Sequence, residues 1–350
     1  MTVSRRRSDP QGTLVPNAFV EDGGLHGETR RQTQAGWRRE GDQRLRTHEQ
    51  RILNAVQRPQ AYREVVLDSA AVRIVLSVWD GEPGRPVVVF LPGTMTHPLF
   101  YEEFLDALNR SGMTVVGMHP AGHGKSPRLP RRQLTFEAVV SNALDAVAWA
   151  QADRPGAPLL VVGSSQGGVL ALAVAARAAG VTAVFAHNVL DPALPGTLSI
   201  TRAPAWLAPA YLPLHTALTW LARLAPGLPV PFDVYLEMAR VSADPEVADY
   251  LHTDPLGLRS YPLRFLSQLL AAGLPGPARC EVIVVAAAGD PLFSLDYTRQ
   301  VYERIAAPTK ELLILDVAEH LIFNACLDAV LPALIPRMLG YPGMGNLPAP

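Results

Sequence analysis

The pentapeptide Gly163-Ser164-Ser165-Gln166-Gly167 is the strongest chemical signal in the sequence. It places Ser165 in a Gly-x-Ser-x-Gly frame, after an apolar run at 158–162 and before an alanine-rich helical run at 166–179. A strand that turns abruptly into a helix holds the turn residue in a strained conformation with its side chain in a cleft. Glycines on both sides avoid a clash across the corner. The pattern therefore predicts that Ser165 is a nucleophile.

A serine nucleophile needs a base, and the base needs a partner that fixes its tautomer. In elbows of this kind the chain order is serine, then acid, then histidine. Asp290 follows the strand-like run 281–287, and His320 follows the run 312–315. Open parallel sheets place their sites at the carboxyl ends of strands. We therefore predict Ser165, Asp290 and His320 as the catalytic residues.

Other residues compete for these two roles. Asp290 could instead be a turn residue before proline, and His320 a residue at a helix start. Asp191, after the preceding strand, is a reserve acid. His123 and His187 are weaker base candidates, because they lie before or close to the elbow and in a different chain order.

An oxyanion formed during acyl transfer needs two donors. The backbone N–H of Gln166, directly after the nucleophile, is the first, and the start of the following helix favours negative charge. The second is expected from the loop after the run 87–91, where Gly93 permits a close backbone approach. The N–H of Thr94 is our first choice and that of Met95 the alternative. Without the elbow, this loop would be interpreted as an ordinary strand-to-helix turn.

Strand-like and helix-like runs alternate through much of the chain. Strands are expected at 63–67, 72–79, 87–91, 114–118, 159–162, 183–186, 281–287 and 312–315. Helices are expected at 100–111 and 136–152, the second with Thr135 as its N-cap. This alternation predicts an α/β fold, a mostly parallel central sheet flanked by helices.

The alternation breaks between Asp191 and about Gly276, where prolines and aromatic residues crowd the chain and no strand-like run is obvious. We interpret 191–276 as an inserted helical cap, 59–190 with 277–340 as the core, and 341–350 as a C-terminal tail. Residues 1–58 are polar and arginine-rich, and are expected to be a disordered extension.

The aromatic residues of the cap and one residue of the oxyanion loop are candidates for substrate binding. They are Met95, Trp206, Tyr211 and Trp220. Simple packing of the cap is the competing interpretation for its aromatics. Contact of the cap with a membrane surface is a further alternative. Three prolines within 203–222 argue against a transmembrane helix there.

The bulk composition excludes several classes of protein. A net charge of -1 argues against nucleic acid as the main partner. The two cysteines, Cys280 and Cys326, have no spacing that suggests a disulfide framework or a thiolate metal site. No metal-binding motif and no need for a cofactor is evident. A cytoplasmic location is expected, since no apolar segment of a secretory signal follows Arg5-Arg6-Arg7.

From residue 62 to about 339 the chain resembles the α/β-hydrolase superfamily. The resemblance is carried by Pro92-Gly93-Thr94, Gly122-His123-Gly124-Lys125-Ser126, the elbow, Asp290 and His320. It departs from the usual pattern at His119, where an aspartate is common, and at Pro92, where His-Gly is common. The lysophospholipase and monoacylglycerol-lipase-like branch is the most similar one. This resemblance implies a serine hydrolase that cleaves carboxylic esters of apolar acyl or aromatic substrates.

Several alternatives stay open on the same three residues: an amidase, a thioesterase, a peptidase that releases proline, or a cofactor-free perhydrolase. A dehalogenase or epoxide hydrolase is disfavoured, because those enzymes use an aspartate where this chain has Ser165. From another class, the scaffold could serve as a non-catalytic binder of small molecules. A binder would not need the base and the acid.

Overall fold

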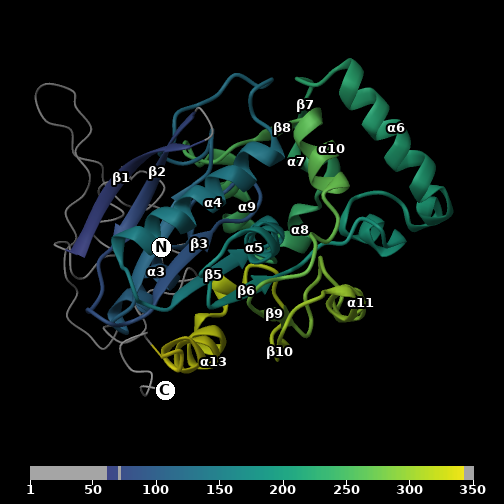
Figure 1. Cartoon of the computed structure of the whole chain (residues 1–350). Coiled ribbons are helices and arrows are strands. Elements are labelled where there is room, and N and C mark those ends of the chain that lie inside the picture. Colours follow the sequence, from purple (N-terminus) through teal and green to yellow (C-terminus); the bar gives the residue numbers. More distant parts are fainter. Residues whose placement is uncertain (1–60, 70–71, 343–350) are drawn as a thin grey trace, which may run out of the picture. The chain divides into compact units, whose positions relative to one another are not determined.

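The computed structural model describes residues 61–69 and 72–342. Its centre is an eight-stranded sheet with the order β1-β2-β4-β3-β5-β6-β9-β10 (Figure 1). The strands are β1 (Tyr62–Ser69), β2 (Val72–Trp79), β3 (Val87–Leu91), β4 (Thr114–His119), β5 (Leu159–Ser164), β6 (Ala183–His187), β9 (Glu281–Ala287) and β10 (Lys310–Leu315). Strand β2 runs antiparallel to both neighbours, and every pair from β4 to β10 is parallel. The predicted mostly parallel sheet is confirmed.

The central strands are buried along their whole length. Every residue of β3, β4, β5 and β6 is buried, and Val89 of β3 lies between Val116 and Val161 of its two neighbours. Continuous apolar runs of this kind form strands that helices cover on both faces.

Two groups of helices flank the sheet. Helices α4 (Phe136–Asp153) and α5 (Gln166–Arg177) pack on each other and on the central strands. Helix α3 (Glu102–Arg110), which follows the short η3 (Pro98–Tyr101), packs instead against α12 (Ile322–Ala325) and α13 (Leu327–Leu339). Helix α11 (Leu295–Arg304) contacts β9. Thr135 caps α4 as predicted, because its hydroxyl accepts the N–H of Ala138 at 3.1 Å.

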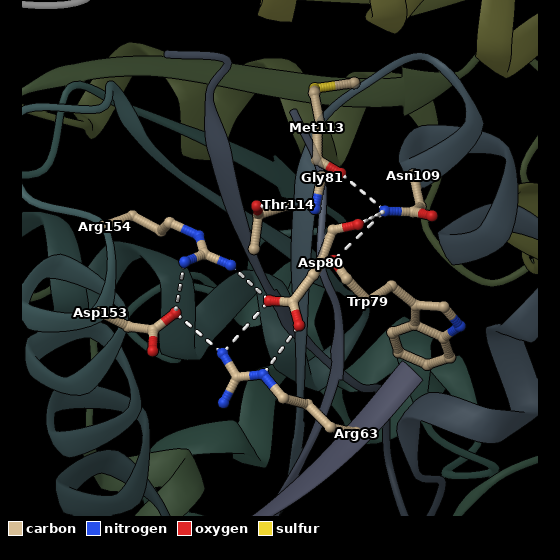
Figure 2. A network of polar contacts seen from close by, with 9 residues as sticks. All are labelled: Arg63, Trp79, Asp80, Gly81, Asn109, Met113, Thr114, Asp153 and Arg154. Carbon is tan, nitrogen blue, oxygen red and sulfur yellow. Dashed lines mark hydrogen bonds and ion pairs between the residues drawn. The ribbon is translucent and has the colours of Figure 1, made fainter. Parts of the chain in front are cut away.

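Charged side chains fix the end of β2 to its neighbours (Figure 2). The carboxylate of Asp80 accepts hydrogen bonds from Arg63 of β1 at 2.9 and 3.2 Å, and it also pairs with Arg154 beyond α4. Arg63 reaches Asp153 at 2.9 Å as well. These side chains are between about one quarter and two fifths exposed. Each ion pair alone therefore contributes little to stability, and the network contributes more.

Asn109 of α3 is fully buried beside this network, and its amide group donates to the carbonyls of Trp79, Asp80 and Met113 at 3.0–3.2 Å (Figure 2). Replacing Asn109 with alanine removes this donor from three carbonyls, two of them in buried contacts, so we expect a loss of about 1–3 kcal/mol in the free energy of unfolding. Urea denaturation measures this loss. Arg85→Ala, at an exposed ion pair, is the control and should change stability by less than about 0.5 kcal/mol. Equal effects of the two changes would contradict the assigned role.

We call residues 191–276, between β6 and β9, the cap. Its helical elements are η4 (Pro195–Ile200), η5 (Ala205–Ala210), α6 (Tyr211–Leu224), α7 (Phe232–Tyr235), α8 (Met238–Val241), α9 (Pro245–Thr253) and α10 (Leu263–Ala271). Helix α10 packs against both α6 and α4, and so joins the cap to the core (Figure 1).

The cap also contains two short strands, β7 (Pro229–Pro231) and β8 (Ser260–Pro262), which pair antiparallel. No strand-like run is obvious here in the sequence, because strands of three residues that contain prolines are too short to show an alternating pattern. The cap boundaries stay predictions. The predicted extension 1–58 and residues 343–350 of the predicted tail lie outside the described residues. In the described part, no helix combines the length and apolarity needed to cross a bilayer.

Candidate active site

Ser165 occupies the sharp corner between β5 and α5. Its backbone has φ 53° and ψ −116°, a region that residues other than glycine rarely adopt and that costs energy. The corner is as tight as the motif requires. A Cβ on Gly163 would lie 2.0 Å from the carbonyl oxygen of Gly167, and a Cβ on Gly167 would lie 2.0 Å from that of Leu91.

Asp290 and His320 meet beyond the ends of β9 and β10. The distance between His320 Nδ1 and Asp290 Oδ2 is 3.1 Å, and both side chains are almost fully buried. The other carboxylate oxygen of Asp290 accepts the backbone N–H groups of Leu292 and Phe293 at 2.7 and 2.8 Å. The ring of Phe293 stacks on the His320 imidazole. Three hydrogen bonds, one from His320 and two from the backbone, thus fix the orientation of this carboxylate.

Burial alone would raise the pKa of Asp290, but the hydrogen bond and charge of His320, with His187 and the Phe293 N–H, bring it below its usual value. The carboxylate is therefore ionised at neutral pH. The ionised carboxylate accepts a hydrogen bond from the N–H at Nδ1 of His320. The proton thus stays on Nδ1, and Nε2 has a lone pair. Ser165 and His320 line the same cavity. The structure thus brings the three predicted residues to one place.

Asn188, directly after β6, is a site residue that the sequence analysis missed. Its backbone has φ 61°, and its side-chain Nδ2 lies 3.0 Å from Asp290 Oδ2 and 2.7 Å from His187 Nε2. The amide donates to both. Asn188 Nδ2 also lies 3.0 Å from His320 Nδ1, because both nitrogens converge as donors on one oxygen of Asp290. An asparagine after a strand carries no signal of such a contact across the sheet.

Two further histidines are buried near the cavity and are neutral. Burial lowers the pKa of His187 to about 3, with a smaller effect from the charge of His320. Burial lowers the pKa of His123 to about 4. Both histidines were weaker base candidates. A histidine with so low a pKa is a neutral imidazole at neutral pH, with one N–H and one nitrogen lone pair. Nε2 of His187 accepts a hydrogen bond from the amide of Asn188.

These two histidines predict loss of stability in mild acid. In the unfolded chain each takes up a proton near pH 6.5, whereas in the folded protein each stays neutral until about pH 4 or 3. The unfolded state therefore binds more protons between these values. We expect the free energy of unfolding to fall by up to about 1.4 kcal/mol per pH unit for each histidine as the pH drops from 6.5 to 4.

Urea denaturation at several pH values measures this slope. His187→Gln should reduce it, because glutamine cannot take up a proton. His215→Gln, at a cap residue for which no such burial exists, is the matched control and should leave the slope unchanged. A wild-type stability that stays constant from pH 6.5 to 4 would contradict the prediction.

The reserve acid Asp191 serves another partner. Its carboxylate lies 2.6 Å from Nε of Arg304 and accepts the backbone N–H of Ala193. The structure therefore does not bring Asp191 to His320. Both Asp191 and Asp290 follow a strand, so this position alone did not show which of them partners His320. Their contacts in the structure make the distinction.

The loop after β3 faces the elbow across the cavity. Gly93, Thr94 and Met95 line the cavity together with Ser165 and Gln166. The N–H of Met95 donates to the hydroxyl of Tyr261 at 2.9 Å. Within residues 61–69 and 72–342, the hydrogen bonds include none from the N–H of Thr94 or of Gln166. Of the two expected alternatives, Thr94 thus has its N–H available and Met95 does not.

The cavity has a volume of about 280 Å³ and is almost wholly apolar. The cap supplies many aliphatic side chains to its wall, among them Leu218, Leu236, Leu251, Leu263, Leu266 and Leu270. The lining combines a few polar groups with a mainly apolar wall, as in many sites for small molecules.

Of the four residues expected to bind substrate, Met95 lines the cavity. Trp206 and Trp220 lie outside it, with 76 % and 59 % of their surfaces exposed. Tyr211 is buried, but its hydroxyl donates to the carbonyl of Pro192 at 2.7 Å and its side chain is also outside the cavity wall. Residue type alone did not indicate which aromatic side chains face inward. Among the described residues, no cluster of histidine, cysteine or acidic side chains is suited to hold a metal.

A family model described as serine aminopeptidase, S33 matches residues 82–326. The chain therefore belongs to this family of α/β hydrolases, and the predicted hydrolase class is confirmed. A monoacylglycerol lipase of Mycolicibacterium smegmatis is 28 % identical over 271 residues, which cover 72 % of this chain and 88 % of the relative.

Solved structures of similar fold include lipases and an esterase. A monoglyceride lipase from Saccharomyces cerevisiae has a TM-score of 0.61 at 16 % identity, over 79 % of this chain and 94 % of that one. The monoacylglycerol lipase of Paleococcus ferrophilus has a TM-score of 0.58 at 18 % identity, over 76 % and 98 %. A carboxyl esterase of Bacillus coagulans has a TM-score of 0.58 at 16 % identity, over 80 % and 98 %. They support the fold.

Proposed function

We propose that this protein hydrolyses carboxylic esters with an apolar acyl group through an acyl-enzyme intermediate. The observation that carries the proposal is the convergence of the strained Ser165 and the Asp290–His320 pair on one apolar cavity. Thr94 and Gln166 line the same cavity, and their backbone N–H groups, which have no hydrogen-bond partner among the described residues, suit a developing negative charge.

In the first half-reaction, Ser165 Oγ attacks the acyl carbon while His320 Nε2 takes its proton. The Asp290 carboxylate stabilises the imidazolium that forms. The N–H groups of Thr94 and Gln166 hold the oxyanion, and His320 then gives its proton to the leaving alcohol. In the second half-reaction His320 deprotonates a water molecule, which attacks the acyl carbon. The bond between that carbon and Ser165 Oγ then breaks, His320 returns its proton to Oγ, and the acid leaves.

The cavity wall and the relatives together suggest the substrate class. The wall is mainly apolar and leucine is its most frequent residue, which fits an acyl chain better than a polar group. Curated and structural relatives include proteins named monoacylglycerol lipase. We propose esters of a single fatty acyl chain, with monoacylglycerols among them.

Aminopeptidase activity, suggested by the description of the family model, is the second candidate. A substrate with a free α-ammonium group would need an unpaired carboxylate in the cavity. Among the described residues, Asp254 is the acid that lines the cavity, and it is already paired with His97 at 2.7 Å. This pairing favours the ester over the amino-acyl substrate.

A panel of p-nitrophenyl esters of graded chain length, with an amino-acyl p-nitroanilide and a monoacylglycerol alongside, tests the proposal. We expect turnover of the esters and the monoacylglycerol, and little or none of the anilide. Preferential turnover of the anilide would overturn the ester assignment. A protein that neither turns over any of these compounds nor reacts with a fluorophosphonate probe would instead fit a non-catalytic binder.

We also propose that the cap contacts an anionic lipid surface. Four apolar side chains of η5 and α6 are strongly exposed, namely Trp206, Leu212, Trp220 and Leu224. Large exposed apolar patches often mark contact sites. The stretch 192–232 contains two arginines and no acidic residue, and such a combination favours anionic lipids. A cytoplasmic location, which we also propose, fits a peripheral enzyme of this kind.

Co-sedimentation with vesicles of anionic phospholipid tests this contact. The Trp206→Ser, Trp220→Ser double variant should bind several-fold more weakly than wild type. Val66→Ser, which removes an exposed apolar side chain of β1, is the matched control. Equal binding by all three proteins would exclude this docking surface, and cell fractionation tests the location.

A further inference from the structure

Tyr261 lies at the junction between the cap and the loop that faces the elbow. It belongs to β8 of the cap, it is fully buried, and its ring stacks on Phe265 with centroids 3.9 Å apart. Its hydroxyl contacts three groups from three distant segments. These are the N–H of Met95 at 2.9 Å, Nε2 of His123 at 2.8 Å and Nε2 of Gln166 at 3.5 Å.

The directions of these hydrogen bonds follow from one carbonyl group. His123 Nδ1 lies 2.9 Å from the carbonyl oxygen of Ala121. A carbonyl only accepts, so Nδ1 carries the proton and Nε2 has the lone pair. The Tyr261 hydroxyl therefore donates its hydrogen to His123 and keeps its oxygen lone pairs for the N–H of Met95. Burial lowers the pKa of His123 to about 4, which agrees with this neutral tautomer.

Met95 is held on both sides by the same part of the cap. Its N–H donates to Tyr261, and its carbonyl accepts the N–H of Leu258 at 3.0 Å. Its backbone has φ 59°, in the left-handed region that a methionine seldom adopts without support from its surroundings. The Met95 N–H belongs to the peptide group that follows Thr94, so the Tyr261 hydroxyl fixes the orientation of that peptide group.

We propose that Tyr261 is a positioning residue of the oxyanion hole, with His123 as the acceptor that orients its hydroxyl. The hydroxyl holds Met95 in its left-handed conformation, and thereby keeps the N–H of Thr94 directed at the cavity. This inference rests on the proposed ester hydrolysis. It also couples the cap to the chemistry, because displacement of residues 258–261 would release the loop that carries the donor.

Tyr261→Phe is the principal test, because it keeps the stacked ring and removes only the oxygen. On a short, water-soluble p-nitrophenyl ester we expect kcat to fall about 10- to 100-fold, since a misplaced oxyanion donor costs transition-state stabilisation. KM should change less than about threefold, because the hydroxyl binds no part of the acyl chain. Tyr211→Phe is the matched control. It removes another buried cap hydroxyl, which bonds Pro192 outside the cavity, and should keep kcat within twofold.

Variants of His123 test whether the two residues act as a unit. His123→Ala removes the acceptor, and the double variant with Tyr261→Phe should lose no more activity than Tyr261→Phe alone. His123→Gln restores an acceptor oxygen and should recover part of the activity lost in His123→Ala. If the loss of activity in the double variant equals the product of the two single losses, the residues act independently. That result would overturn the proposed role of His123 in orienting the Tyr261 hydroxyl.

A measurement that does not use activity keeps the inference separate from the proposed function. Amide hydrogen exchange of the peptide that contains Met95 should become at least about tenfold faster in Tyr261→Phe and unchanged in Tyr211→Phe. Unchanged exchange, or a kcat within twofold of wild type, would overturn the role of Tyr261. Absence of ester turnover and of fluorophosphonate labelling in the wild type would instead overturn the proposed function, and the exchange result would still decide the structural role.

Discussion

Replacement of Ser165 by alanine is expected to lower kcat for a p-nitrophenyl ester by about 10⁴- to 10⁶-fold, the range seen when a serine nucleophile is removed. The reason is that Ser165 is the residue at the corner between β5 and α5, where its backbone has φ 53°, and that it lines the cavity. Stability should be retained, because alanine lacks only one oxygen. Steady-state kinetics and labelling with a fluorophosphonate probe measure the effect.

Ser199→Ala is the control for this change. Ser199 is a cap serine whose hydroxyl donates to the carbonyl of Gly196 at 2.7 Å on the exposed surface. It should keep wild-type kcat and full labelling. If the Ser165 variant retained more than about one hundredth of the wild-type rate, the hydrolysis would proceed by a route that does not use this nucleophile.

The second large effect is expected from Asp290→Asn, which should lower kcat by about 10³- to 10⁴-fold. Asparagine has nearly the shape of aspartate, so the backbone N–H groups of Leu292 and Phe293 keep an acceptor. However, the neutral amide no longer stabilises an imidazolium at His320, and a misdirected NH₂ group would favour the wrong tautomer. KM for short esters should change little.

Asp191→Asn separates the two candidate acids. Asp191 pairs with Arg304, which is half exposed, so its substitution should leave kcat within about twofold. Full activity in Asp290→Asn combined with a large loss in Asp191→Asn would reverse the assignment. Because Asp290 has a lowered pKa, its ionisation should not limit the rate until the pH falls below its ordinary titration range.

Local patterns predicted most of the sheet. The bounds of β2, β3 and β9 agree with the expected runs, because continuous apolar residues between turn residues specify a buried strand without help from distant segments. The sequence also predicted that Ser165, Asp290 and His320 lie at one edge of the sheet. Each residue follows a strand, and the carboxyl ends of parallel strands share one edge.

Local sequence patterns could not predict the contacts between segments that are far apart in the chain. Asn188 reaches across to Asp290, and Tyr261 lies 166 residues from its partner Met95. Neither residue type nor spacing encodes such a meeting. Trp206 and Trp220 were expected to bind substrate, but they are exposed. In a proline-rich stretch no periodic pattern shows whether an aromatic residue faces the interior or solvent.

The sites where the cap leaves and rejoins the sheet have a consequence for how substrate range can diversify. Strands β6 and β9 pair in parallel register from Ala183 with Glu281 to His187 with Val285, so the whole excursion between them starts and finishes on adjacent strands of one ladder. Neighbouring strands are about 4.8 Å apart, and a longer or shorter excursion changes loop-closure entropy only slowly. Recombination at these two junctions could therefore place the cap of another protein on the same core, provided that the new segment supplies a hydroxyl at the position of Tyr261.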